Sequence, residues 1–165
     1  MPSLANYPVY KQAADNSCWA CAARSIANFN FGNPVTKYAT DQDLAKACGF
    51  PDINTQQSAA AALAKIGIGN NTDDHPIPSA AEIKEQIEAN RPLLTIVGAG
   101  DPKGVPNLKC KLGHWVVIVG ISDDGKTIGV FDPDQGKVNQ LPYDPATYVK
   151  GLYWENSSYV DPPQK

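Results

Sequence analysis

The sequence lacks the features by which chains bind nucleic acid or cross a membrane. It carries 14 Lys and Arg against 17 Asp and Glu, a net charge of −3, and no basic cluster interleaved with aromatic residues. Proteins bind the phosphate backbone through such basic patches, so we expect no nucleic-acid partner. No apolar run reaches the roughly 18 residues that a membrane-spanning helix needs, so we expect no membrane partner.

A signal peptide is also missing from the start of the sequence. The segment from Met1 to Gln12 has neither the basic start nor the apolar stretch of such a leader. We therefore expect a soluble chain. Its compartment stays open, because leaders are removed and because secreted proteins and effectors can be delivered without a recognisable signal peptide.

Cysteine and histidine are both scarce. Four cysteines in 165 residues are too few for a disulfide scaffold, so we expect mostly free thiols, with one bridge possible. There are two histidines. His75 lies in a polar loop and is assigned no role, whereas His114 opens an apolar segment behind Gly113. The cysteines are Cys18, Cys21, Cys48 and Cys110.

Helical patterns fill the first half of the chain and strand patterns fill the second. We expect helices over residues 18–31, over 41–47 with Thr40 as cap, over an alanine-rich stretch capped by Asn54 or Thr55, and from a Ser79 capping box to Pro92. β-Branched and apolar runs predict strands over residues 93–97, 115–119, 127–131 and 151–154, with a hairpin turn at 123–126.

These elements predict one domain of the α+β class. A chain of 165 residues with 42% hydrophobic content is long enough to bury one core. We expect the domain to span residues 1–165, with a helical part over about 12–91 and an antiparallel sheet over about 92–156. We expect it to act as a monomer.

Cys18 is the candidate nucleophile. A thiol attacks as its thiolate, which is stabilised at the positive N-terminal end of a helix and beside an imidazolium. The helical pattern begins near Cys18, and this places its thiol at such an end. Cys21, one turn later, is expected to be a core residue or a bridge partner of Cys48, and less readily a resolving thiol.

The candidate base is His114, with Asp132 to orient it. His114 begins a predicted strand, which holds a side chain more rigidly than the loop around His75. The next antiparallel strand ends at Asp132, where a carboxylate can accept a hydrogen bond from the imidazole. Asp134 is the alternative acid, because a shift of two residues keeps the same strand face.

Gln12 is the candidate oxyanion donor. Attack on a carbonyl develops negative charge on its oxygen, and preorganised donors stabilise that charge. A side-chain amide just before the nucleophile can serve together with the backbone amide of Cys18.

Several of these segments resemble the papain superfamily. Gln12 stands six positions before Cys18, and Trp19 follows the cysteine, as in that superfamily. The run from Gly113 to Gly120, followed by Phe131-Asp132-Pro133, is similar to the compact bacterial branch of bacteriocin-processing and effector-type cysteine peptidases, in which an aspartate replaces papain's asparagine.

The resemblance implies a two-lobe papain-like fold and a cysteine peptidase. A helical lobe would carry Cys18, and a β-lobe would carry His114 and Asp132. His114 would take the thiol proton, the thiolate would attack the scissile carbonyl, and water would release the acyl enzyme. No cofactor or metal is expected, and the partner would be a peptide or protein substrate.

Four alternative functions remain open. A peptidoglycan amidase or a transglutaminase-like acyl transferase would use the same three residues. A zinc-binding module could use Cys18, Cys21, Cys110 and His114, which have plausible ligand spacing. A thiol-disulfide oxidoreductase could use Cys18 and Cys21, but the expected strand before such a motif is absent from the pattern.

Overall fold

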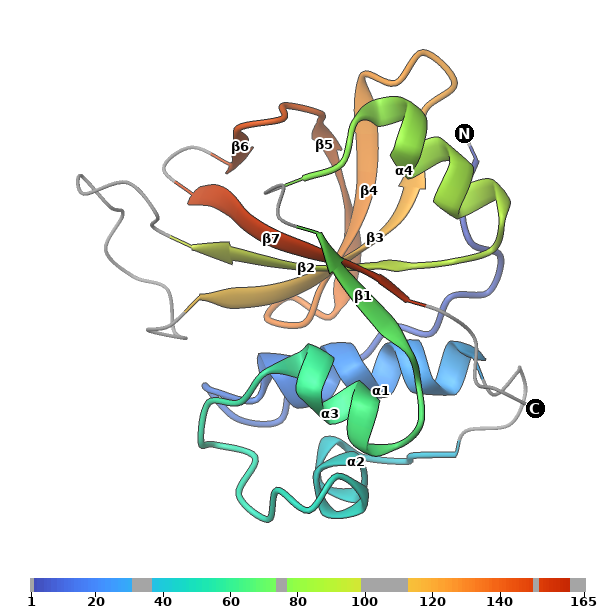
Figure 1. Cartoon of the computed structure of the whole chain (residues 1–165). Coiled ribbons are helices and arrows are strands. Elements are labelled where there is room, and N and C mark those ends of the chain that lie inside the picture. Colours follow the sequence, from blue (N-terminus) through green and yellow to red (C-terminus); the bar gives the residue numbers. More distant parts are fainter. Residues whose placement is uncertain (1, 31–36, 74–76, 99–112, 150–151, 161–165) are drawn as a thin grey trace.

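The computed structural model describes residues 2–30, 37–73, 77–98, 113–149 and 152–160. In these ranges three helices, α1 to α3, lie together on one side of an antiparallel sheet, and a fourth helix, α4, lies apart from them (Figure 1). The sequence-based prediction of an α+β fold with a helical part followed by an antiparallel sheet is therefore confirmed.

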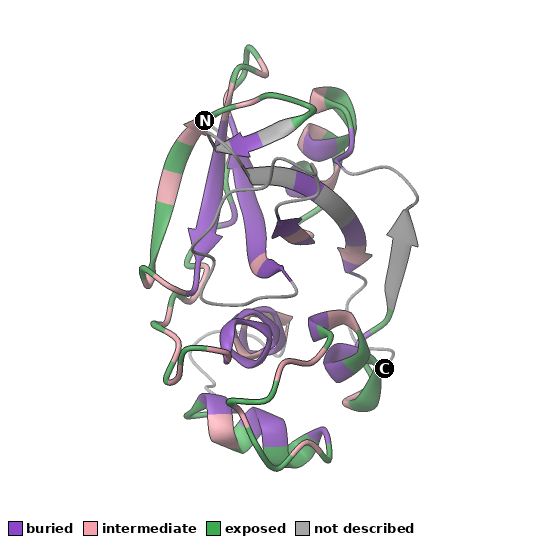
Figure 2. Ribbon diagram, turned by 90° about the vertical axis from the view of Figure 1, so that its left-hand side faces the viewer, coloured by how far each residue is buried: buried purple, intermediate pink, exposed green. Residues whose placement is uncertain are grey.

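Helix α1, Cys18–Asn30, is the centre of the helical side. Ten of its 13 residues are buried, because it contacts α2 (Asp41–Ala47), α3 (Ala59–Lys65) and strand β3 (His114–Ile121). In Figure 2 this helix is seen end-on, with buried residues around most of its circumference. A helix that is apolar nearly all round is expected in such an enclosed position.

Three shorter helices have the capping residues that define their starts. Helix α2, Asp41–Ala47, begins after Thr40 as predicted, and α4, Ala80–Glu88, begins with the predicted capping box of Ser79 and Glu82. Helix α3, Ala59–Lys65, is capped by Ser58 and not by Asn54 or Thr55.

The prediction of the α3 cap was wrong for a local reason. The backbone N–H of Asn54 and the hydroxyl of Thr55 both donate to the carboxylate of Asp52, at 2.9 and 2.8 Å. These two residues therefore belong to a turn built on Asp52. Ser58, which comes next among the hydroxyl residues, accepts from the N–H of Ala61 at 3.2 Å and starts the helix.

The sheet has the strand order β1-β7-β2-β3-β4-β5, and β6 pairs with β7. The predicted strands correspond to β2, Leu93–Gly98, β3, His114–Ile121, β4, Thr127–Asp132, and β7, Leu152–Val160. The predicted turn joins β3 to β4, with Gly125 at φ 72°. Strands β1, Asn70–Asp73, β5, Lys137–Pro142, and β6, Thr147–Val149, were not predicted.

The missed strands are polar or short, so they lack the apolar alternation that identifies a strand in sequence. β1 has the sequence NNTD, yet it pairs along its length with β7. β7 itself extends to Val160, well beyond the predicted end at Trp154, because it is hydrogen-bonded between β1 and β2. Backbone pairing, which the side-chain pattern does not report, determines these elements.

One hydrophobic core joins the helical side to the sheet. Its largest fully buried side chains include Trp19 from α1, Leu63 from α3, Ile118 from β3 and Phe131 from β4. No helix of the described ranges combines the length and the apolar character needed to span a bilayer.

Candidate active site

Cys18 is the first residue of α1, and a hydrogen-bonded turn leads into it. The hydroxyl of Ser17 accepts from the N–H of Ala14 at 2.9 Å and donates to the carbonyl of the same residue at 3.0 Å. The Ser17 carbonyl then accepts from the N–H of Cys21 at 3.0 Å and begins the helix. Cys18 is therefore at the positive end of the α1 dipole, where a thiolate is stabilised.

The imidazole of His114 lies directly against the carboxylate of Asp132. Nε2 of His114 and Oδ1 of Asp132 are 2.6 Å apart, and each residue is 7% exposed. In the β3–β4 register Val117 faces Phe131. Continued by one pair, this register sets Asp132 opposite Val116, which shares a strand face with His114.

The carboxylate of Asp132 is also held from its own turn. Its Oδ1 accepts from the backbone N–H of Asp134 at 2.9 Å. The structure thus brings Asp132 against the imidazole, while Asp134, the alternative acid, contributes its backbone amide to the same carboxylate. With Nε2 bound to Asp132, Nδ1 is the imidazole nitrogen left to exchange a proton with a thiol.

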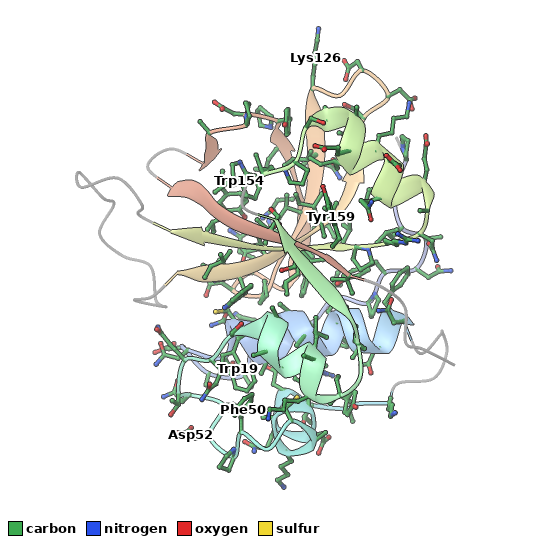
Figure 3. The ribbon with its side chains drawn as sticks, viewed as in Figure 1. Trp19, Phe50, Asp52, Lys126, Trp154 and Tyr159 are labelled. Atoms are coloured by element: carbon green, nitrogen blue, oxygen red, sulfur yellow. The ribbon has the colours of Figure 1, made fainter. Side chains whose placement is uncertain are left out.

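A cavity of about 290 Å³ lies beside Cys18, between the helical side and the sheet. Trp19 and residues 56–58 line it from the helical side, and Ile96 of β2, Gly113 just before β3 and Trp115 of β3 line it from the other side. The residues on both sides of His114 therefore face the cavity that Cys18 lines. Trp19 packs edge-on against Phe50, with ring centroids 5.8 Å apart (Figure 3).

Gly113 satisfies two requirements at the sheet side of this cavity. Its φ is 120°, a conformation that L residues rarely adopt. A Cβ at this position would also lie 2.8 Å from Cδ1 of Ile96. The glycine therefore lets the chain enter β3 close to β2, so that β3 begins at His114.

Gln12 lies in the loop before Cys18, with its amide hydrogens directed at that loop. Nε2 donates to the carbonyls of Ala14 and Asp15, at 2.8 and 3.0 Å. The backbone N–H of Gln12 donates to the carbonyl of Pro133 at 2.8 Å and links the loop to the turn after Asp132. Stabilising a substrate oxyanion directly would require Gln12 to exchange one of its two side-chain bonds.

Two residues that the sequence did not single out, Asp41 and Arg24, hold this loop in place. Asp41 is 1% exposed, and its Oδ2 accepts from the N–H of Ala13 at 2.9 Å. Its Oδ1 lies 3.4 Å from Nη1 of Arg24. The guanidinium of Arg24 also donates through Nε to the carbonyl of Tyr38 at 3.0 Å and lies 3.6 Å above the Tyr10 ring.

Burial raises the pKa of Asp41, whereas the Ala13 amide and the Arg24 guanidinium act in the opposite direction. In the sequence Asp41 has the pattern of an ordinary acidic residue in the first turn of a helix. Only the long-range contact with Ala13 distinguishes it, and the sequence pattern does not reveal that contact.

Cys21 and Cys48 are buried free thiols, so they do not form the bridge that was left open between them. Their sulfur atoms donate to the carbonyls of Tyr10 and Ala62, at 3.4 and 3.2 Å. Burial raises the pKa of both thiols, which disfavours their nucleophilic form. Both have the contacts of core residues.

The predicted zinc alternative is only partly covered by the described residues. Cys110 lies outside them, as does His75. Within the ranges that are described, no group of three or more His, Cys, Asp and Glu side chains is arranged to hold a metal.

The architecture of the site is that of an α+β papain-like fold, with a cysteine on the helical side and a histidine and an aspartate on the sheet. The profile of the Peptidase_C39 like family matches residues 4–162. The chain belongs to this family.

Two solved structures share the fold at low sequence identity. The peptidase domain of Streptococcus ComA, described as a bi-functional ABC transporter involved in a quorum-sensing pathway, is 15% identical with a TM-score of 0.62, over 96% of this chain and 100% of that one. A putative C39-like peptidase from Bacillus anthracis is 15% identical with a TM-score of 0.62, over 98% of each chain. No curated protein matches the chain.

Proposed function

We propose that the protein is a cysteine peptidase in which Cys18 is the nucleophile, His114 the acid-base catalyst and Asp132 the residue that orients it. One observation carries the proposal. The imidazole of His114 is bound at 2.6 Å by a buried carboxylate, and Gly113, the residue before His114, lines the same cavity as Cys18, the first residue of α1. Membership of a peptidase family supports the same reaction class.

The two ring nitrogens of His114 determine the path of the transferred proton. Asp132 accepts from Nε2–H, so Nδ1 takes the proton of the Cys18 thiol and an imidazolium forms beside the thiolate. The sulfur then adds to the scissile carbonyl carbon, and Nδ1–H protonates the leaving amine as the C–N bond breaks. Water, deprotonated by Nδ1, hydrolyses the thioester and restores the thiol.

The developing oxyanion would be stabilised by the N-terminal end of α1, including the backbone amide of Cys18, and by the Gln12 amide after exchange of one loop bond. In the described geometry Gln12 also shapes the loop that carries the nucleophile. Gln12→Ala would remove both the donor to the oxyanion and the hydrogen bonds that shape the loop.

The test is to identify the thiol that a limiting amount of an epoxide inhibitor of cysteine peptidases alkylates, by mass spectrometry of the whole protein and its peptides. We expect rapid single labelling of Cys18. Cys21 and Cys48 serve as internal references, because burial keeps both thiols protonated.

His114→Ala should abolish the rapid labelling, and Asp134→Asn is the matched carboxylate control that should keep it. Slow and equal labelling of several cysteines would count against the proposal. Incubating a cleaved peptide with added amines then shows whether water or an amine accepts the acyl group, and so separates a hydrolase from an acyl transferase.

A further inference from the structure

A second cavity, of about 240 Å³, lies at the opposite end of α1 from Cys18. Asn30 ends α1 and lines this cavity, and a helix of 13 residues places its two ends roughly 18 Å apart. Figure 1 shows the ends of α1, α4 and β7 together on the right of the view. The cavity lies between these three ends and is lined by Phe29, Asn30, Ala89, Asn90, Arg91 and Val160.

The side chain of Asn30 leaves a hydrogen-bond donor unused inside the protein. Its Nδ2 is buried and meets no acceptor in the described part of the chain. Asn28, on the same helix, differs. Its Nδ2 donates to the Tyr10 hydroxyl and the Tyr38 carbonyl, both at 2.9 Å, and its Oδ1 accepts from the Tyr38 N–H. Buried polar groups are nearly always paired, so an unpaired donor in a cavity wall indicates that the cavity takes up an acceptor.

Arg91 adds a positive charge to the same wall. Its backbone N–H donates to the carbonyl of Gln86 at 2.9 Å, and the N–H of Asn90 donates to the carbonyl of Ile87 at 3.0 Å. These bonds hold the turn after α4 and satisfy two of the last carbonyls of the helix, which weakens the negative end of its dipole. A guanidinium has five N–H donors in a planar fork that suits a carboxylate, and it can bind one in addition to a protein group.

Phe29 and Val160 supply apolar surface to the cavity. The Phe29 ring is held by the ring of Tyr7, with centroids 5.2 Å apart, and Val160 is a buried register partner of Asn70. An apolar cavity of about 150 Å³ accommodates a benzene ring, whereas sites for drug-sized ligands run from about 300 Å³ upward. At about 240 Å³ there is room for a carboxylate that carries one short apolar group.

We propose that this cavity is a second binding site, which takes a small carboxylate with one apolar group. The carboxylate accepts from Nδ2 of Asn30 and from the Arg91 guanidinium, and the apolar group is buried against Phe29 and Val160. Free carboxylic acids and the C-terminal residue of a peptide share this chemistry. The inference goes beyond the proposed function, because the site lies at the other end of α1 from Cys18 and its test does not use the thiol.

The experiment is a titration of the full chain with isovalerate, followed by NMR of the side-chain amide of Asn30 and the Nε–H of Arg91. We expect both signals to shift, while the side-chain amide of Asn28 does not. Isovaleramide is the neutral analogue of the same shape, and inorganic phosphate is an anion without an apolar group. Each should bind roughly 10- to 100-fold more weakly, since it lacks one of the two kinds of contact.

N-Acetyl-leucine distinguishes the two sources of the carboxylate, because it represents the end of a peptide. Binding at least as tight as that of isovalerate would identify the ligand as a peptide C-terminus. Binding of isovalerate alone would identify it as a free acid.

Two variants test the residues that form the site. Arg91→Gln should weaken isovalerate binding roughly 10- to 100-fold. Lys126→Gln is the matched control, since it removes the same charge at the exposed turn between β3 and β4, far from the cavity (Figure 3). Asn30→Leu should abolish the binding of isovalerate and raise the melting temperature of the unliganded protein, because it removes an unpaired buried donor at similar volume.

Several outcomes would overturn the inference and leave the proposed function intact. One is the absence of any shift with both isovalerate and N-acetyl-leucine. Another is equal binding of isovalerate, isovaleramide and phosphate, which would show that neither charge nor apolar surface selects the ligand. A lower melting temperature in Asn30→Leu would also count against it, because the amide would then have a partner within the protein.

Discussion

The two sides of the candidate site hold their proposed reactive groups by different means. On the sheet, His114 and Asp132 lie on neighbouring strands, and the backbone hydrogen bonds of the β3–β4 ladder determine their separation. On the helical side, Cys18 follows a loop with no ladder of its own. That loop is held by side chains, chiefly Asp41, Ser17 and Gln12.

This difference indicates where the site is vulnerable. A strand position is supported by many backbone bonds, so one substituted side chain leaves it in place. A loop held by a few polar side chains moves when one of them is lost, and the buried partners that remain then lack hydrogen bonds. Substitutions on the helical side should therefore move the backbone as well as affect the chemistry, whereas those at His114 and Asp132 should leave the backbone in place.

The largest effect should come from Cys18, the proposed nucleophile. Cys18→Ala should lower kcat by on the order of 10⁶, as removal of a nucleophile does in other hydrolases. Cys21→Ala, one turn along the same helix, should retain activity because its buried thiol is a core residue. Turnover of a peptide substrate by the two variants measures the contrast, and comparable losses in both would mean that α1 as a whole, not one thiol, is required.

Asp132→Ala should lower kcat by roughly 10²- to 10⁴-fold, because the imidazole loses the acceptor that fixes its tautomer and orientation. The melting temperature should change little if the strand ladder alone positions His114. Asp134→Ala is the control, since it keeps the backbone amide through which Asp134 contacts Asp132. A large loss of stability in Asp132→Ala, together with its loss of activity, would mean that the strand ladder alone does not hold the sheet side of the site.

Where the residues of the candidate site lie in the fold could largely be predicted from sequence, because they begin or end strongly patterned elements. Cys18 opens a helical pattern, and His114 opens an apolar strand behind Gly113. Asp132 ends the strand next to it. The fold class could be predicted from the same patterns, since the hydrophobic period of a long segment indicates whether it forms a helix or a strand.

What could not be predicted depends on contacts between distant segments. Strand β1 has a polar sequence, and only pairing with β7 makes it a strand. Asp41 contacts Ala13 across 28 positions of sequence, so nothing local marks it as part of the site. Gln12 was predicted as an oxyanion donor from its position, but its amide orientation depends on where the Ala14 and Asp15 carbonyls lie in the folded loop.

Gln12→Ala should lower kcat by roughly 10²–10³ if the amide donates to the oxyanion. Gln12→Glu keeps the length of the side chain but removes the same donors, including those to the Ala14 and Asp15 carbonyls, so a comparison of kcat with thermal stability separates the two roles. An equal loss in both variants with unchanged KM fits a donor role. Near-normal turnover by Gln12→Ala would exclude it, and a loss confined to thermal stability would leave Gln12 as a residue that shapes the loop.

Asp41→Asn should destabilise the fold by about 1–3 kcal/mol, because the amide keeps only one of the two buried acceptor oxygens that bind the Ala13 amide and Arg24. It should also slow alkylation of Cys18, since the loop before the thiol loses its anchor. Asp43→Asn, at an exposed position of the same helix, is the control. Chemical denaturation measures the change in stability. If Asp41 does not anchor the loop, Asp41→Asn and Asp43→Asn should be equally stable.

The smallest effect should be a pH dependence that belongs to Asp41 alone. Burial raises the pKa of this carboxyl in the folded protein above its ordinary value of 3.8, so the folded state binds the proton more tightly than the unfolded state. Its contribution to stability is therefore full below the unfolded pKa and is lost as the pH rises through the folded pKa.

The free energy of unfolding of the wild type minus that of Asp41→Asn should accordingly fall as the pH is raised from below 4 towards neutrality. Taking the difference cancels the contribution of the other carboxyl groups to the pH dependence, because they titrate in both proteins. A difference that grows with pH would mean that the Arg24 guanidinium and the Ala13 amide stabilise the charged carboxylate by more than burial destabilises it. The charged form of Asp41 would then be the better anchor for the loop that carries Cys18.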